Sequence, residues 1–219
     1  MNYENVRKGV SKIFTGEIIG LFGSVALMVT AVLSVLALAM SETGESADTL
    51  FITIGILAIV SIALMLVAYI INLVGVGQAS KDESSFRSAF YMAIFGIVFS
   101  VLSGFLGNAS EGNFFAQRLI SMIPELVNLI MMICIVSGIL NISATLHNSE
   151  MVSKGETILR IVFTVAMISL VVRAVSGLIQ SYVGTYIVMS ILAFSGILSV
   201  VNYFLYLSYL SKVKKMLAE

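Results

Sequence analysis

Residues 50–77 read LFITIGILAIVSIALMLVAYIINLVGVG and contain no Asp, Glu, Lys or Arg. An α-helix needs about 20 mostly apolar residues to cross the hydrocarbon core of a bilayer, which is about 30 Å thick. This stretch is therefore long and apolar enough to form a membrane-spanning helix. Five further charge-poor stretches have a similar length: Ile13–Met40, Ser88–Gly107, Pro124–Leu146, Ile161–Gln180 and Val183–Leu210.

The composition of the whole chain agrees with a membrane location. Hydrophobic residues make up 59% of the 219 residues and charged residues only 11%, against about 45–50% and about 25% in soluble domains. Six spans leave almost no chain for a soluble domain. We therefore expect an all-α, polytopic integral membrane protein in which residues 1–219 form a single transmembrane domain and the lipid bilayer is the main partner.

The distribution of basic residues predicts the orientation in the membrane. Ten of the 12 Lys and Arg residues lie before the first span, in the second and fourth loops, or after the last span; on the opposite side only Arg118 is basic. Loops rich in Lys and Arg stay in the cytoplasm. We expect both termini to be cytoplasmic, and we assign the protein to the plasma membrane of a bacterium.

Several residues near the predicted inner ends of the spans resemble membrane-interface anchors. Tyr203, Tyr206 and Tyr209 are spaced as an aromatic belt would be. Val6, Val10 and Ile13 form one stripe before the first span, and Phe86 and Phe90 are four residues apart before the third. This pattern predicts that all these side chains dip into the lipid interface.

The charged loops suggest an internal repeat. A shift of 73 residues places Lys81 on Lys154, Glu83 on Glu156 and Arg87 on Arg160. The repeat units would be approximately 1–78, 79–146 and 147–219, which predicts three parallel helix hairpins around a pseudo-threefold axis. The alternative is a chance alignment of apolar helices, whose restricted alphabet makes coincidences common.

Ionisable residues within the spans are the main candidates for a functional site, because a charge costs at least a few kcal/mol there. Glu17 could be a proton or cation ligand, or could stay hydrated near the inner interface. Glu125 and Arg173 are expected at a similar depth, with Asn128 one turn from Glu125. They are expected to form either a substrate, anion or proton site or a structural clamp between two helices. Alternatively, Glu125 is a first-turn residue after Pro124 that lies close to the headgroups.

Two further patterns, one of asparagines and one of glycines, can be explained by contacts between helices. Asn72, Asn141 and Asn202 lie near the inner ends of the even-numbered spans, where they form either a polar inner ring or ordinary interhelical hydrogen bonds. Gly16, Gly20 and Gly23 give the first span a face of small residues, which is suited to close helix packing.

The sequence lacks the residue patterns of common membrane enzymes. His147 is the only histidine, so paired-histidine metal sites are excluded. No nucleophile motif or phosphate-binding loop is present, and no basic domain suits a nucleic acid. We therefore predict no enzyme activity, no catalytic residues, no metal, no cofactor and no nucleic-acid partner.

Two classes of function remain. The first is a small transporter or permease for an ion or small solute, favoured slightly by the repeat and by the charges within the spans. The alternative is a non-catalytic membrane subunit, or an accessory or immunity-type protein, that acts through a partner in the bilayer. A homo-oligomer is compatible with both.

Overall fold

The computed structural model describes residues 3–42, 48–109, 114–183 and 185–218. Their side chains are described except at 42, 48, 103–109, 114–122, 125, 173–174, 176–183, 185–193, 195 and 199. The described chain is all-helical, as predicted. Its helices are α1 (Glu4–Glu42), α2 (Asp48–Ala79), α3 (Ser84–Ala109), α4 (Phe114–Thr145), α5 (Ser149–Val183) and α6 (Thr185–Met216).

Five helical segments of the described chain have the length and hydropathy needed to cross a membrane. They are Glu4–Ser41, Thr49–Ala79, Ser84–Leu102, Leu126–Thr145 and Ser149–Val172. Many of their apolar side chains point outward: Met28 and Ile59 are 71% and 70% exposed. Lipid is the medium in which such a surface is stable, so these helices indicate a membrane protein. A sixth span within α6 stays a prediction.

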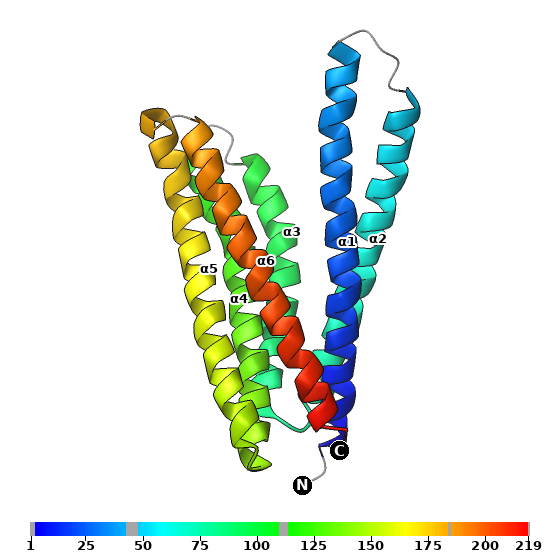
Figure 1. Cartoon of the computed structure of the whole chain (residues 1–219), viewed down its shortest axis with the longest axis vertical. Helices are drawn as coiled ribbons and strands as arrows, with labels where there is room; N and C mark the ends of the chain where they lie inside the picture. The colour runs from blue at the N-terminus through cyan, green and yellow to red at the C-terminus, as the bar shows by residue number, and fades with distance from the viewer. Residues whose placement is uncertain (1–2, 43–47, 110–113, 184, 219) are drawn as a thin grey trace.

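The main contacts join each helix to the next one along the chain and join α6 back to α1, so the helices form a ring. The contact between α1 and α2 is the most extensive, whereas those of α2 with α3 and of α1 with α6 are small. Figure 1 shows the helices converging where α1 begins and α6 ends, which we call the terminal end. Towards the other end, α1 and α2 diverge from α3–α6.

The hydrophobic core lies at the terminal end and draws residues from every helix. Its fully buried members include Val6 and Val10 of α1, Phe86 of α3, and Tyr206 and Tyr209 of α6. The prediction that these side chains lie in the lipid interface was therefore wrong. They turn inward because the last turns of α6 and the first turns of α1 and α3 all contribute side chains to one buried cluster, and burial there removes their apolar area from water.

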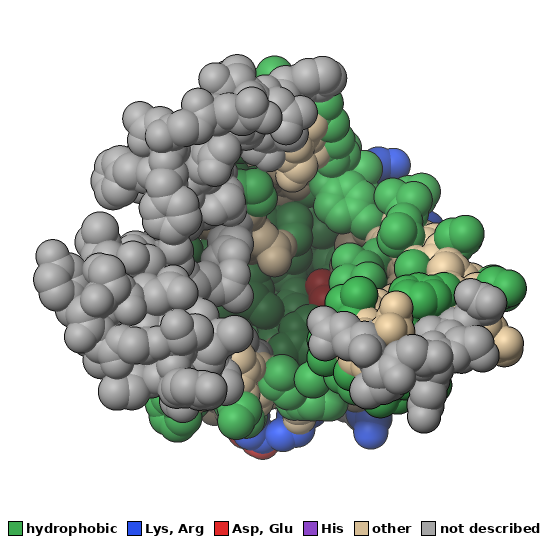
Figure 2. Space-filling model, turned by 90° about the horizontal axis from the view of Figure 1, so that it is seen from above, with side chains coloured by type: hydrophobic (Ala, Val, Ile, Leu, Met, Phe, Trp, Pro, Cys, Tyr) green, Lys and Arg blue, Asp and Glu red, His purple; other side chains and the backbone are tan. Residues whose placement is uncertain are grey.

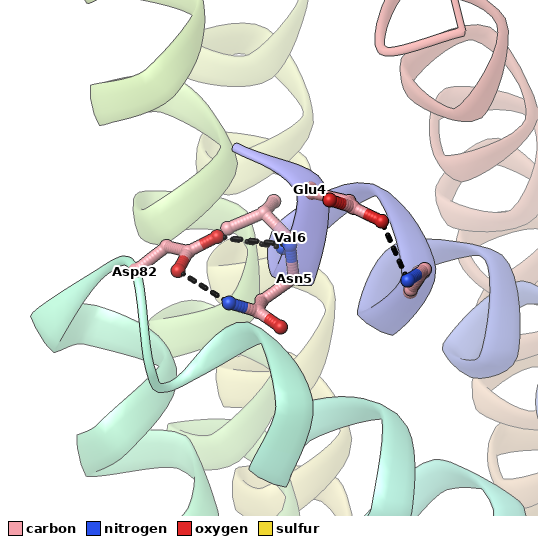
Figure 3. Close-up of polar contacts among 5 residues, drawn as sticks. Glu4, Asn5, Val6 and Asp82 are labelled. Carbon is pink, nitrogen blue, oxygen red and sulfur yellow. Dashed lines mark hydrogen bonds and ion pairs between the residues drawn. The ribbon is translucent and has the colours of Figure 1, made fainter. Parts of the chain in front are cut away.

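The loop between α2 and α3 caps the start of α1. The Asp82 carboxylate accepts hydrogen bonds from the backbone N–H groups of Asn5 and Val6, at 3.0 and 3.2 Å, and from the Asn5 side-chain amide at 2.9 Å (Figure 3). The first N–H groups of a helix have no partner within it, and a carboxylate there also complements the helix dipole. Asp82 thus ties two segments that are distant in sequence.

Replacing Asp82 with Ala should destabilise the terminal end. We expect the free energy of unfolding to fall by about 1–2 kcal/mol, the usual cost of losing a helix cap. We also expect faster hydrogen exchange at the amides of Asn5 and Val6. The matched control is Glu4→Gln, which breaks the exposed ion pair of Glu4 with Lys8 (2.6 Å) and should leave both measurements unchanged. Equal effects of the two substitutions would contradict the capping role.

Candidate functional site

A cavity of about 530 Å³ lies inside the ring of helices, within the size range of small-molecule sites. On the side of the terminal end its floor is made by Ile13, Val76, Ile135 and Tyr206, which are also members of the buried core. Figure 2 views the molecule from the opposite end and shows a central hollow with an acidic side chain in its wall. The core therefore closes the cavity at the terminal end.

Glu17 of α1 is the acidic residue that lines this cavity. The Asn72 amide of α2 donates a hydrogen bond to its Oε1 at 3.1 Å. The Tyr203 hydroxyl of α6 lies 2.7 Å from its Oε2 and 2.8 Å from its backbone oxygen. Glu17 thus joins three helices, including the sparsely packed pair α1 and α6.

The hydrogen bonds to Glu17 come from neutral donors and do not balance its charge. A carboxylate can accept about four hydrogen bonds, and among the described side chains the donors to its two oxygens are one amide and one hydroxyl. None of the described side chains that line the cavity belongs to Lys, Arg or His. A charge in such a setting needs a compensating cation or a proton. The arrangement therefore has the chemistry to take up either a proton or a cation at Glu17.

Glycines on α1 bring Asn72 within reach of Glu17. A Cβ atom at Gly16 would lie 2.2 Å from Asn72 Oδ1 and 2.9 Å from the Ala68 backbone oxygen. Gly23 is similarly close to Met65 of α2, whereas Gly20 has more room, with Ala68 Cβ at 3.5 Å. The small-residue face predicted from the sequence therefore lies against α2.

The candidate residues named from the sequence occupy different environments. Glu17, Asn72 and Asn128 all line the cavity. The Asn141 amide instead donates to Glu83 Oε1 at 3.0 Å, beside the loop between α2 and α3, and Asn202 is buried on α6 without lining the cavity. Of the three asparagines of the predicted inner ring, only Asn72 reaches the cavity.

The predicted pair of Glu125 and Arg173 lies outside the described side chains. Their backbones belong to α4 and α5, respectively, which are in contact. The pairing stays a prediction.

Three tyrosines of the cavity were missed as site residues: Tyr69, Tyr203 and Tyr206. Tyr203 was assigned to an aromatic belt, but Val200, Tyr203 and Tyr206 all line the cavity. Their spacing of three residues marks one helix face, and this was the available signal. The hydroxyl of Tyr69 on α2 donates to the Ala93 backbone oxygen of α3 at 2.7 Å. No signal in the sequence distinguishes Tyr69 from other aromatic residues of the spans.

Among the described residues, no three His, Cys, Asp or Glu side chains group as metal ligands would, so Glu17 is best treated as a single carboxylate site. Comparisons with protein-family models, curated proteins and solved structures find no match for this chain.

Proposed function

We propose that this protein is a membrane transporter that carries a small cationic solute, with Glu17 as the solute-binding group. The observation that carries the proposal is the Glu17 carboxylate, which has no Lys, Arg or His partner among the described side chains, in a cavity of solute size. A bilayer-embedded carboxylate is costly. Its free-energy cost is offset when a cation binds beside it, which gives such a residue a functional use.

The topology predicted from the sequence completes this proposal. The sequence predicts six spans, three hairpins with a threefold repeat, and cytoplasmic termini. With both termini in the cytoplasm, the terminal end would be cytoplasmic. The cavity would then face outward, because the core closes its cytoplasmic side. Carrying the solute across would require the helices to separate at the terminal end and close at the other, as alternating access demands.

The test uses the purified full-length protein reconstituted in liposomes of phosphatidylglycerol and phosphatidylethanolamine. Radiolabelled tetraphenylphosphonium and tetramethylammonium serve as cation probes, and radiolabelled citrate serves as the anionic control. We expect saturable uptake of at least one cation, several-fold above protein-free liposomes, and no uptake of citrate. Absence of saturable uptake and of binding for every cation would refute the transporter proposal.

The alternative, a non-catalytic subunit or accessory protein, makes a different prediction for the native membrane. Mild-detergent purification followed by mass spectrometry would then recover a second membrane protein in stoichiometric amount. If the cations bind only when that partner is present, the transport activity belongs to the complex. Recovery of this chain alone, with saturable uptake, supports a self-contained transporter.

A further inference from the structure

We infer that the solute is an amphiphilic organic cation that reaches Glu17 from within the bilayer, through a groove between α2 and the α3–α4 pair. This inference rests on the proposed function and narrows its substrate class. Three observations lead to it: the chemistry of the cavity wall, the position of the groove, and the sparse packing between α2 and α3.

The wall of the cavity suits an organic cation better than a metal ion. Around Glu17 it presents tyrosine rings and apolar side chains, among them Tyr69, Tyr203, Met131 and Met132. Hard metal cations need about six oxygen ligands, far more than one carboxylate provides. An alkyl- or arylammonium ion needs one opposite charge, aromatic faces and apolar contact.

The groove lies next to the central cavity and shares lining residues of α2, α3 and α4 with it. Its volume is about 710 Å³, and it is bordered by Leu66 of α2, by Gly96, Ile97 and Val101 of α3, and by Val127 of α4. Leu66 and Val101 are 60% and 57% exposed. All these helices include segments apolar enough to span the membrane, so the groove opens toward the lipid chains.

Four residues line both the groove and the central cavity: Tyr69, Ala93, Asn128 and Met131. The two spaces therefore adjoin at these side chains. Tyr69 lies at this boundary, and its hydrogen bond to the Ala93 backbone oxygen bridges α2 and α3. Because α2 and α3 share little other contact, a rotation of the Tyr69 side chain would join the groove to the cavity.

This arrangement selects for amphiphilic cations. A solute with apolar groups concentrates in the bilayer and meets the groove there, whereas a small hydrophilic cation does not partition into lipid. Once in the cavity, its charge would be balanced by Glu17 and its apolar part would contact the methionines. The polar Asn128 side chain, which lines both spaces, offers a hydrogen-bonding group along the path.

The experiment narrows the groove and leaves the cavity intact. Val101→Trp places a bulky ring at the groove, and the matched control is Val98→Trp, on the same helix, 52% exposed and not lining the groove. We expect the initial rate of tetraphenylphosphonium uptake into proteoliposomes to fall about tenfold in Val101→Trp. The same rate should be unchanged in Val98→Trp, and the Kd for this cation in detergent should stay within about twofold in both.

A second pair of variants, on α2 across the groove, tests whether a loss of uptake in Val101→Trp is caused by misfolding of that variant. Leu66 borders the groove, whereas its neighbour Val67 is exposed outside it. We expect the initial rate of tetraphenylphosphonium uptake to fall about tenfold in Leu66→Trp and to be unchanged in Val67→Trp. Equal uptake rates in groove and control variants would overturn lateral entry. Binding of tetramethylammonium with no binding of tetraphenylphosphonium would overturn the substrate class yet leave the cation site standing. If neither cation binds the unmodified protein, the proposed function itself fails.

Discussion

Glu17→Gln should abolish most cation binding and leave the fold intact. The amide keeps the size of the side chain and one oxygen, which can accept the hydrogen bond of Asn72, while its NH2 group can donate to the Tyr203 hydroxyl at the place of the other carboxylate oxygen. It removes the charge. Two opposite unit charges about 6–8 Å apart attract by about 2–3 kcal/mol at an effective dielectric constant of about 20. We therefore expect the Kd for tetraphenylphosphonium to rise about 10- to 100-fold, measured by equilibrium binding in detergent and by uptake into proteoliposomes.

The control for this substitution is Glu156→Gln, which removes an acidic residue exposed on α5 and should leave the Kd unchanged. A further variant, Tyr203→Phe, separates ligand binding from helix packing. It removes the hydroxyl that contacts Glu17 and keeps the carboxylate. If Glu17 acts only as a tie between helices, Tyr203→Phe and Glu17→Gln should lower the thermal stability equally, and neither should change the Kd.

Gly9→Ala should be among the most destabilising single substitutions in the described part of the chain. A Cβ atom at Gly9 would lie 2.5 Å from the Gly75 backbone oxygen and 2.8 Å from Ala79 Cβ. Backbone atoms cannot move aside as a flexible side chain can, so α1 and α2 would have to separate. Overpacking of this kind costs about 1–3 kcal/mol, and we expect a loss near the upper end, measured as the free energy of unfolding in a denaturing detergent.

Gly55→Ala is the matched control, since Gly55 lies on α2 and a Cβ atom there would meet nothing within 4 Å. It should not lower the free energy of unfolding, because alanine is the better helix former. A loss equal to that of Gly9→Ala would show that the effect comes from the helix backbone and would refute the close contact between α1 and α2.

The close approach of α1 and α2 also supports the site. Gly9 meets Gly75 about two helical turns from Gly16, on the side of the terminal end. At Gly16 the absence of a side chain leaves room for Asn72. Separating the two helices should therefore withdraw the Asn72 amide from Glu17. Packing and the candidate site depend on the same glycine face.

The helices could be predicted from the sequence because their cause is local. A long apolar stretch in a bilayer must satisfy its backbone hydrogen bonds internally, and a helix does this without any partner. Stretches such as Leu50–Gly77 therefore determine α2 whatever surrounds it. The same reasoning marked Glu17 as a candidate, because a charge within a span is unusual wherever the span is placed.

The partners of each helix face were decided only in the tertiary structure. The sequence places Val6, Phe86 and Tyr206 near the terminal end, where an apolar stripe is equally compatible with anchoring in the lipid interface and with packing in a protein core, so periodicity cannot distinguish the two. They are buried because the end of α6 and the starts of α1 and α3 contribute to the same cluster. Likewise, nothing local relates Glu17 to Tyr203, or Asp82 to Asn5. These contacts join segments far apart in the chain, so they exist only once the ring of helices has closed.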